Sequence, residues 1–197
     1  LSEMTAKDAL AHPNWNMGAK ITIDCATMLN KGFEVIEAMR LYDAPLEKVE
    51  VVMHRESIVH SMVAFEDGAV LAQMSYPSME VPIQLALTYP ERLRANVAPL
   101  DLAKISALHF SAPDPARYPC FTLALECAKQ GGDMPCALNA AGEVAVQAFL
   151  RGQIKYTQIA EIIEKTLRKT VRREAESYAL LEETDGAARR TARSFLP

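Results

Sequence analysis

Four helical patterns follow one another with short links in the last part of the chain, and they constrain the fold more than any other feature. They run over Tyr118–Lys129, Cys136–Arg151, Thr157–Thr170 and Tyr178–Phe195. Thr157 stands where a threonine caps the start of a helix. Because consecutive helices joined by short links pack antiparallel, the sequence predicts a carboxy-terminal helical bundle.

The preceding part of the chain mixes strand and helix patterns. Lys20–Asp24 alternates as a short strand does, and a helical pattern follows from Ala26 to Tyr42. β-Branched residues are frequent in VEVVMH, SIVHSMVAF and AVLAQMSY, and Asp67-Gly68 supplies a hairpin turn between the last two. We therefore expect an α/β (α+β) portion with a mostly antiparallel sheet, followed by an all-α bundle.

Prolines recur from Pro77 to about Pro115, interrupted by one short helical pattern near Val81 to Leu87. Such a stretch is typical of a connection between two bodies, with a boundary near Pro113. The expected domains are a catalytic portion over residues 1–88, a connector over 89–114 and a helical domain over 115–197.

Composition excludes several classes of function. The 197 residues carry a formal net charge of −4 with both signs interspersed, so we expect no nucleic-acid partner. No apolar run approaches the roughly 20 residues of a bilayer-spanning helix, and no signal peptide is recognisable. Four scattered cysteines indicate neither a zinc site nor a disulfide framework, and Cys120, Cys127 and Cys136 are expected in the core.

One segment carries candidate chemistry. Asn30, Lys31 and Glu34 are three or four residues apart on a predicted helix, so an amide, an ammonium group and a carboxylate share one face. Together they suit a phosphorylated, metal-chelating ligand. On spacing alone, an exposed Lys31–Glu34 pair worth about 0.2–0.5 kcal/mol is the favoured explanation, so spacing by itself does not establish a site.

The order of residues adds information that spacing lacks. H-P-x-W-x-M-G-x-K-I-x-x-D-x-A-T-x-x-N-K-G-x-E, read from His12 to Glu34, closely resembles the substrate loop and helix of 1-deoxy-D-xylulose 5-phosphate reductoisomerases. The resemblance continues through ESIVHSMVAFEDGAVLAQ and ALNAAGEVAVQAFL. It implies NADPH-dependent isomerisation and reduction of 1-deoxy-D-xylulose 5-phosphate (DXP) to 2-C-methyl-D-erythritol 4-phosphate, in the non-mevalonate isoprenoid pathway, with magnesium or manganese.

The resemblance also implies site residues. Glu34 matches a metal-binding carboxylate, and Glu34 and Lys31 are the expected catalytic residues. Gly32 and Met17 are expected near the nicotinamide cofactor. The expected substrate-binding residues are His12, Trp15, Met17, Cys25, Asn30, Lys31 and Glu34. His54 and His60, six residues apart on predicted strands, are interpreted as structural.

Some residues depart from the family pattern. Cys25 replaces a substrate-contacting serine, and a charge reversal at Glu80 is expected to disturb any local ion pair. Gly142-Glu143 stands where Asn-Glu is usual, Pro77-Ser78-Met79-Glu80-Val81-Pro82 where P-D-M-R-x-P is usual, and His54-Arg55-Glu56-Ser57 where H-P-Q-S is usual.

The glycine-rich nucleotide loop and the D-S-E stretch of the family have no counterpart in these residues. We expect a missing upstream half, no activity of the chain alone, a homodimer through the region around Val51 to Gln73, and a cytoplasmic or plastid-stromal location. Two alternatives stay open. One is a non-catalytic truncated homologue that dimerises or binds a sugar phosphate, and the other is a diverged oxidoreductase acting on another phosphorylated ketose.

Overall fold

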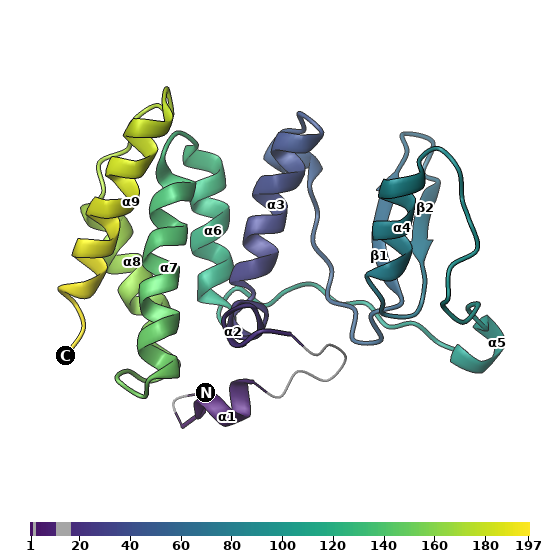
Figure 1. Cartoon of the computed structure of the whole chain (residues 1–197), viewed down its shortest axis with the longest axis horizontal. Helices are drawn as coiled ribbons and strands as arrows, with labels where there is room; N and C mark the ends of the chain where they lie inside the picture. The colour runs from purple at the N-terminus through teal and green to yellow at the C-terminus, as the bar shows by residue number, and fades with distance from the viewer. Residues whose placement is uncertain (2, 11–16) are drawn as a thin grey trace. The chain divides into compact units, whose positions relative to one another are not determined.

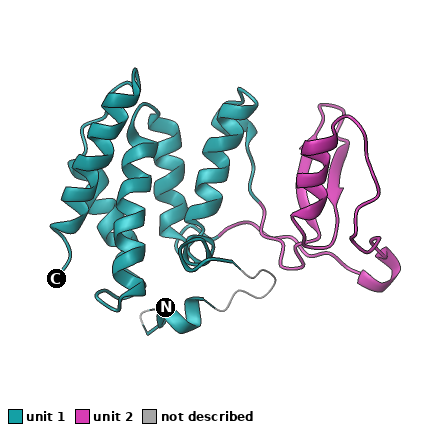
Figure 2. Ribbon diagram, viewed as in Figure 1, with its two compact units in different colours: residues 1–51, 114–197 teal, residues 52–113 magenta. Residues whose placement is uncertain are grey.

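The computed structural model describes residues 1, 3–10 and 17–197. The chain divides into two compact units, which Figure 2 colours separately. Unit 1 joins residues 1–51 to residues 114–197, and unit 2 comprises residues 52–113. These units are defined by packing contacts, and unit 1 combines both ends of the chain. They are therefore not the same kind of division as the predicted domains with boundaries at residues 88 and 114, which stay a prediction.

Unit 1 is entirely helical within the described residues (Figure 1). Its elements are α1 (Ala6–Ala9), α2 (Ala19–Ala26), α3 (Leu29–Leu41), η1 (Leu46–Lys48), α6 (Pro119–Gln130), α7 (Met134–Leu150), α8 (Gln158–Lys169) and α9 (Tyr178–Arg193). The last four confirm the predicted bundle. Thr157 is the residue before α8, but its side chain makes no capping hydrogen bond.

The strand predicted at Lys20–Asp24 is wrong, because these residues lie in α2. Five alternating residues are too few to separate a strand from a short buried helix. The β-branched Thr22 fits the helix because its hydroxyl donates to the Gly18 carbonyl 2.9 Å away. The helix ends at Ala26, Thr27 follows it, and Met28 adopts a left-handed backbone with φ of 57° before α3 begins.

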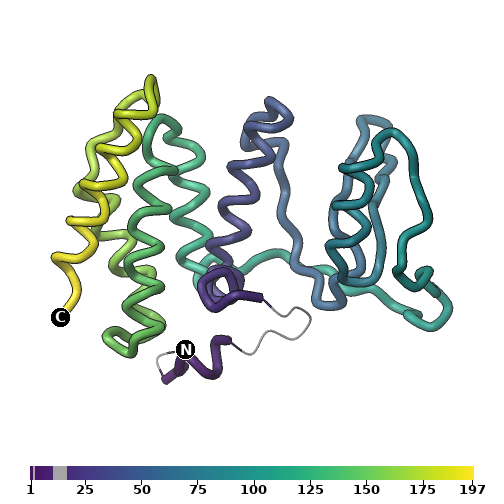
Figure 3. Tube along the Cα trace, viewed as in Figure 1, coloured from purple at the N-terminus to yellow at the C-terminus, as the bar shows by residue number. Residues whose placement is uncertain are grey.

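The trace in Figure 3 shows α3, from the first fifty residues, beside α6, from the later part of the chain. Gly32 of α3 makes this approach possible, since a Cβ at Gly32 would lie 2.2 Å from the Ala124 Cβ. The interior of unit 1 is close-packed and encloses several large apolar side chains completely. They include Ile23, Leu29, Leu138, Ile159 and Ile163.

A buried carboxylate ties the loop before α9 to the start of α7. Asp133 is 1% exposed and accepts hydrogen bonds from the Arg173 backbone N–H at 2.8 Å and the Thr184 hydroxyl at 2.8 Å. The Arg173 Nε adds a longer bond of 3.3 Å. Burial alone would raise the pKa of Asp133, but these hydrogen bonds outweigh it and the net shift is downward.

Unit 2 contains a β-hairpin and two helices. Strands β1 (Val59–Ala64) and β2 (Val70–Met74) pair antiparallel, with Ala64 opposite Val70, and α4 (Glu80–Thr88) and α5 (Leu102–Ile105) follow. The predicted Asp67-Gly68 turn is confirmed, since Gly68 has φ of 88° and Asp67 Oδ1 accepts from the Ala69 N–H at 2.9 Å.

The extended segment VEVVMH does not form the strand that its β-branched residues predicted. Only Met53 pairs there, in a single antiparallel bridge with Ser111. A strand needs a continuous partner, and the segment that returns past Met53 bonds at that one position. The fold class is otherwise as predicted, with a small antiparallel sheet and a helical bundle.

Candidate functional site

The first turns of α3 bring the predicted polar trio together. The Asn30 Nδ2 donates to Glu34 Oε1 at 2.6 Å, and the Lys31 ammonium forms a hydrogen-bonded ion pair with Glu34 Oε2. The side chains of Lys31 and Glu34 are 42% and 43% exposed. The Glu34 carboxylate therefore stands at the surface, held by an amide on one oxygen and a cation on the other.

Cys25 lies on α2, half-buried. Burial raises the pKa of its thiol, and the nearby Glu34 carboxylate raises it further. At neutral pH the sulfur is therefore a neutral, weak hydrogen-bond donor rather than a thiolate nucleophile. A thiol at this position can contact a ligand but holds an anionic oxygen less well than a serine hydroxyl does.

The other predicted site residues differ in what the structure says of them. Gly32 is buried where α3 meets α6, so its lack of a side chain has a packing reason, and the predicted cofactor contact stays a prediction. Met17 is half-buried just before Gly18, the residue that precedes α2. His12 and Trp15 lie outside the described residues.

Sequence reasoning gave no role to Asp24, which lines the same pocket as Asn30 of the trio. Its side chain is 4% exposed, and its Oδ2 lies 2.6 Å from the Lys20 Nζ. Burial raises the pKa of Asp24, against the opposing effect of Lys20. A signal was available, because a charged residue four positions from a lysine interrupts the apolar run ITIDCATML.

A pocket of about 500 Å³ lies among α2, α3 and the start of α7. We call it the α2–α3–α7 pocket. Its wall includes Asn30 of the trio together with Asp24 and Lys20. The remaining lining residues are Ile21, Phe33, Ile36, Glu37, Pro135, Cys136 and Asn139.

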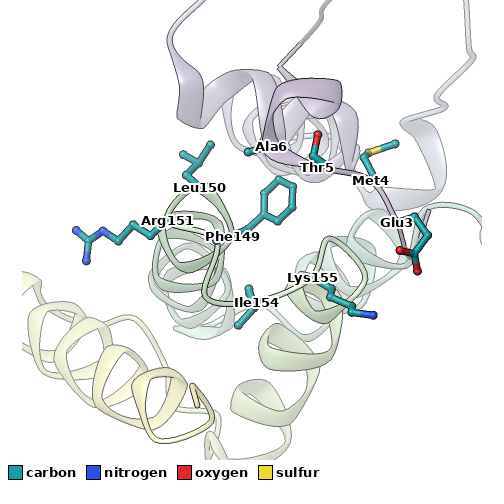
Figure 4. A pocket seen from close by; sticks show the side chains of 10 residues that line it. Glu3, Met4, Thr5, Ala6, Phe149, Leu150, Arg151, Ile154 and Lys155 are labelled. Carbon is teal, nitrogen blue, oxygen red and sulfur yellow. The ribbon is translucent and has the colours of Figure 1, made fainter.

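A second hollow, of about 520 Å³, lies between the segment around α1 and the end of α7 (Figure 4). Its lining includes Met4, Phe149 and Ile154, with Glu3, Arg151 and Lys155 also contributing side chains. Its lining includes none of the predicted site residues that the structure describes, which are Met17, Cys25, Asn30, Lys31, Gly32 and Glu34.

The two histidines interpreted as structural occupy different settings in unit 2. His54 lies outside both strands, so the placement of the two on strands with a shared face is wrong for His54. The Ile58 N–H donates to His54 Nε2 at 3.2 Å, so the ring proton lies on Nδ1, 2.9 Å from the His109 carbonyl. His60 Nε2 lies 3.1 Å from the Ser75 carbonyl.

Two departures from the family pattern also have local explanations. Glu56 accepts from His109 Nδ1 at 2.5 Å, and this hydrogen bond lowers the pKa of Glu56 to about 2. The Ser78 hydroxyl accepts from the Glu80 N–H at 3.1 Å. Glu80 itself begins α4, where a negative charge is favourable, and no ion pair is recorded for it within the described residues.

The described residues supply only part of what a metal and a nucleotide need. Within residues 1, 3–10 and 17–197, no group of three histidine, cysteine or acidic side chains is placed to hold a metal. Glu34 fits as one ligand, because magnesium takes one or two carboxylates and completes its shell with water and ligand oxygens. The sequence has no glycine-rich loop before a helix, so these residues supply no phosphate-binding loop of that type for a dinucleotide.

Comparison with known proteins defines the class. Residues 74–191 match the family model described as the DXP reductoisomerase C-terminal domain. Residues 1–42 match a second model, the 1-deoxy-D-xylulose 5-phosphate reductoisomerase C-terminal domain. Both matches confirm the resemblance found from the sequence motif.

Curated relatives agree with this class. The chain is 53% identical over 197 residues to a 1-deoxy-D-xylulose 5-phosphate reductoisomerase of Geobacillus sp. (strain WCH70), covering 100% of the chain and 52% of the relative. It is 52% identical to that of Cupriavidus pinatubonensis, covering 100% and 50%. The chain belongs to the 1-deoxy-D-xylulose 5-phosphate reductoisomerase family and spans about half the length of the curated relatives it matches.

Solved structures share the fold. The reductoisomerase from Zymomonas mobilis in complex with NADPH aligns with a TM-score of 0.91 at 42% identity, over 98% of this chain and 50% of that one. A DOX-P reductoisomerase in complex with NADPH, fosmidomycin and magnesium aligns with a TM-score of 0.90 at 40% identity, with the same coverage.

No helix in the described part of the chain is long and apolar enough to cross a membrane.

Proposed function

We propose that this chain supplies the substrate-binding helix and one metal ligand of a 1-deoxy-D-xylulose 5-phosphate reductoisomerase, which uses NADPH and magnesium or manganese. The observation that carries the proposal is the trio on α3, where Asn30 and Lys31 both bond to the Glu34 carboxylate. The family relationship and the NADPH and magnesium complexes of similar proteins support it.

The three side chains of the trio offer different chemical groups to a ligand. Lys31 offers a compact positive charge to a phosphate oxygen, and Asn30 offers both a donor and an acceptor to hydroxyl groups. Glu34 offers a hard oxygen to a divalent cation, which when bound would polarise a carbonyl oxygen of the substrate. Before the ligand arrives, the contacts from Asn30 and Lys31 hold the Glu34 carboxylate in place.

Kinetics of Glu34→Gln test this proposal. In the purified full-length product of the gene, the change keeps side-chain size but removes the charge that a cation needs. We expect kcat/KM for DXP to fall by more than the roughly 10–100-fold that loss of an outer-shell partner costs, and the metal concentration for half-maximal activity to rise.

A matched control is Glu164→Gln, which alters an exposed glutamate that pairs with Arg168 at 2.6 Å on α8. This variant should behave as the wild type. Unchanged kinetics of Glu34→Gln would contradict the proposed metal role, and a wild-type protein inactive with DXP would favour the non-catalytic alternative. The 197 residues alone are expected to be inactive, so NADPH oxidation by them would contradict that expectation.

We also propose that the protein is a homodimer that pairs through unit 2. Apolar side chains on both strands of the hairpin are exposed, including Val63 at 59% and Leu71 at 65%. A two-stranded hairpin is marginally stable until its apolar surface is covered. Sedimentation of the wild type against Leu71→Glu should show a dimer that the variant weakens. The cytoplasmic or plastid-stromal location stays a prediction.

A further inference from the structure

Asp24 is the one acidic side chain of unit 1 that is deeply buried without full hydrogen bonding within the described residues. Its side chain is 4% exposed, and one carboxylate oxygen, Oδ2, bonds to Lys20. The other oxygen, Oδ1, is inaccessible to solvent and has no hydrogen-bond partner among the residues that the structure describes. Asp133, the other buried acid, differs because backbone, hydroxyl and guanidinium donors surround it.

A buried charged oxygen without a donor lowers stability, and native proteins satisfy nearly all such atoms. The exceptions cluster at functional sites, where stability is given up for activity. A purely structural ion pair does not explain Asp24, because one of its two carboxylate oxygens has no partner in the described part of the chain. Asp24 lines the same pocket as Asn30, and this shared position points to function instead.

The side chain that Asp24 contacts is Lys20. Its Nζ lies 2.6 Å from Asp24 Oδ2 and 5.9 Å from the centre of the Phe33 ring. An ammonium group has three N–H donors, and among the described residues the Lys20 ammonium pairs with Asp24 alone. Two of its donors are therefore left without a described partner, on a side chain that is 35% exposed and lines the same pocket as Asn30.

The charges around the pocket determine which kind of ligand atom Lys20 can bind. Asp24 neutralises Lys20 at contact distance, and Glu37 adds a further negative charge to the wall. A phosphate group gains little from such a site. A hydroxyl or carbonyl oxygen is neutral and needs only a fixed donor, which a lysine held by a buried carboxylate provides.

We propose that Asp24 is a positioning residue of the substrate site: it fixes Lys20 on the wall of the α2–α3–α7 pocket so that the ammonium donates to a hydroxyl or carbonyl oxygen of the sugar chain. This assignment rests on the proposed function. It extends the trio of α3 with a donor from α2, separate from the phosphate contact expected of Lys31.

The test measures the binding of two probes, DXP and inorganic phosphate, to the full-length protein by calorimetry. Lys20→Met alone would leave the buried carboxylate without its cation, so the variants are Asp24→Asn and the double change Asp24→Asn with Lys20→Met. Both remove the buried charge and should keep the melting temperature at or above that of the wild type. The control is Lys165→Met, which changes an exposed lysine 4.0 Å from Glu161 on α8.

We expect both variants to bind DXP about 10-fold more weakly, and the double change to add little to Asp24→Asn because the two side chains act as one unit. Inorganic phosphate should bind as in the wild type. DXP binding that is unchanged, or phosphate binding that weakens equally, would overturn the assignment. So would a fall in melting temperature that accompanies weaker binding of both probes, since that marks a structural role.

Failure of the proposed function gives a different result. A wild-type protein that does not bind DXP overturns the proposed function, and the positioning role falls with it. A wild-type protein that binds DXP normally, with both Asp24 variants unchanged, overturns the positioning role alone.

Discussion

The two compact units bury their apolar residues to very different extents. Unit 1 encloses Ile23, Leu138, Ile163 and many others with no exposed surface. In unit 2, all of which the structure describes, Ile58 at 5% exposure is the single buried residue. Each fully buried side chain of this size contributes about 1.5–3 kcal/mol to the free energy of unfolding. Unit 1 is therefore stabilised by its own core, whereas unit 2 needs its exposed apolar residues to be covered by another surface.

The difference shows that a segment can form regular secondary structure without burying enough apolar surface to be stable by itself. The hairpin of unit 2 forms around the predicted Asp67-Gly68 turn because its turn chemistry is local. Its strands nevertheless leave side chains such as Val70 and Leu71 more than half exposed. Substitutions should therefore affect unit 1 through its own packing and unit 2 through assembly.

The largest effect is expected at the buried network of unit 1. Asp133→Ala removes the acceptor of three hydrogen bonds and leaves Arg173 and Thr184 without their shared partner. We expect unfolding by denaturant to show a loss of about 4 kcal/mol. The control in unit 2 is Asp101→Ala, at an exposed helix cap, which should cost about 1 kcal/mol or less.

Low pH should reduce the loss of stability that replacing Asp133 causes. The folded-state pKa of Asp133 is below its ordinary value of 3.8, so its ionised form stabilises the fold above that pH. This stabilisation is lost as pH falls through the folded-state pKa. The gap between wild type and Asp133→Asn should therefore narrow below about pH 4, and a gap that widens on acidification would contradict the assigned shift.

The packing of α3 on α6 should be nearly as sensitive. Gly32→Ala places a methyl group 2.2 Å from the Ala124 Cβ, so the helices must separate. We expect a loss of about 3 kcal/mol from thermal and denaturant unfolding. Gly186→Ala on α9 is the matched control, because its nearest contact is the flexible end of Arg190 at 3.3 Å. It should be neutral or stabilise by up to about 1 kcal/mol.

A smaller loss is expected where α2 meets the loop before α8. The Tyr156 hydroxyl donates to the Ala26 carbonyl at 2.9 Å, and burial raises the pKa of Tyr156 to about 12. Tyr156→Phe keeps the ring and removes this bond. The free energy of unfolding should fall by about 1 kcal/mol, and an unchanged value would show that water replaces the hydroxyl.

The smallest effect on unfolding is expected in unit 2. Leu71→Ala trims a side chain that is 65% exposed, so the stability of the dissociated protein should change by no more than about 0.5 kcal/mol. At concentrations where the proposed dimer forms, the same change should weaken association. A large loss at high dilution would show that unit 2 has internal packing of its own.

Much of the fold could be predicted because its signals are local. Helical periodicity located α6 to α9, and the Asp67-Gly68 turn located the hairpin. The spacing of Asn30, Lys31 and Glu34 was enough to predict their shared face, since one helical turn fixes it. Each of these inferences needed only a few neighbouring residues.

Tertiary structure decided what depends on partners distant in the sequence. It made Lys20–Asp24 a helix against an alternating pattern, gave Gly32 its contact with Ala124, and joined Asp133 to Arg173 forty residues away. It also buried Asp24 with one oxygen that pairs with none of the described residues, which no spacing rule predicts. Local sequence sets backbone preference and side-chain spacing, whereas burial and pairing are properties of the packed whole.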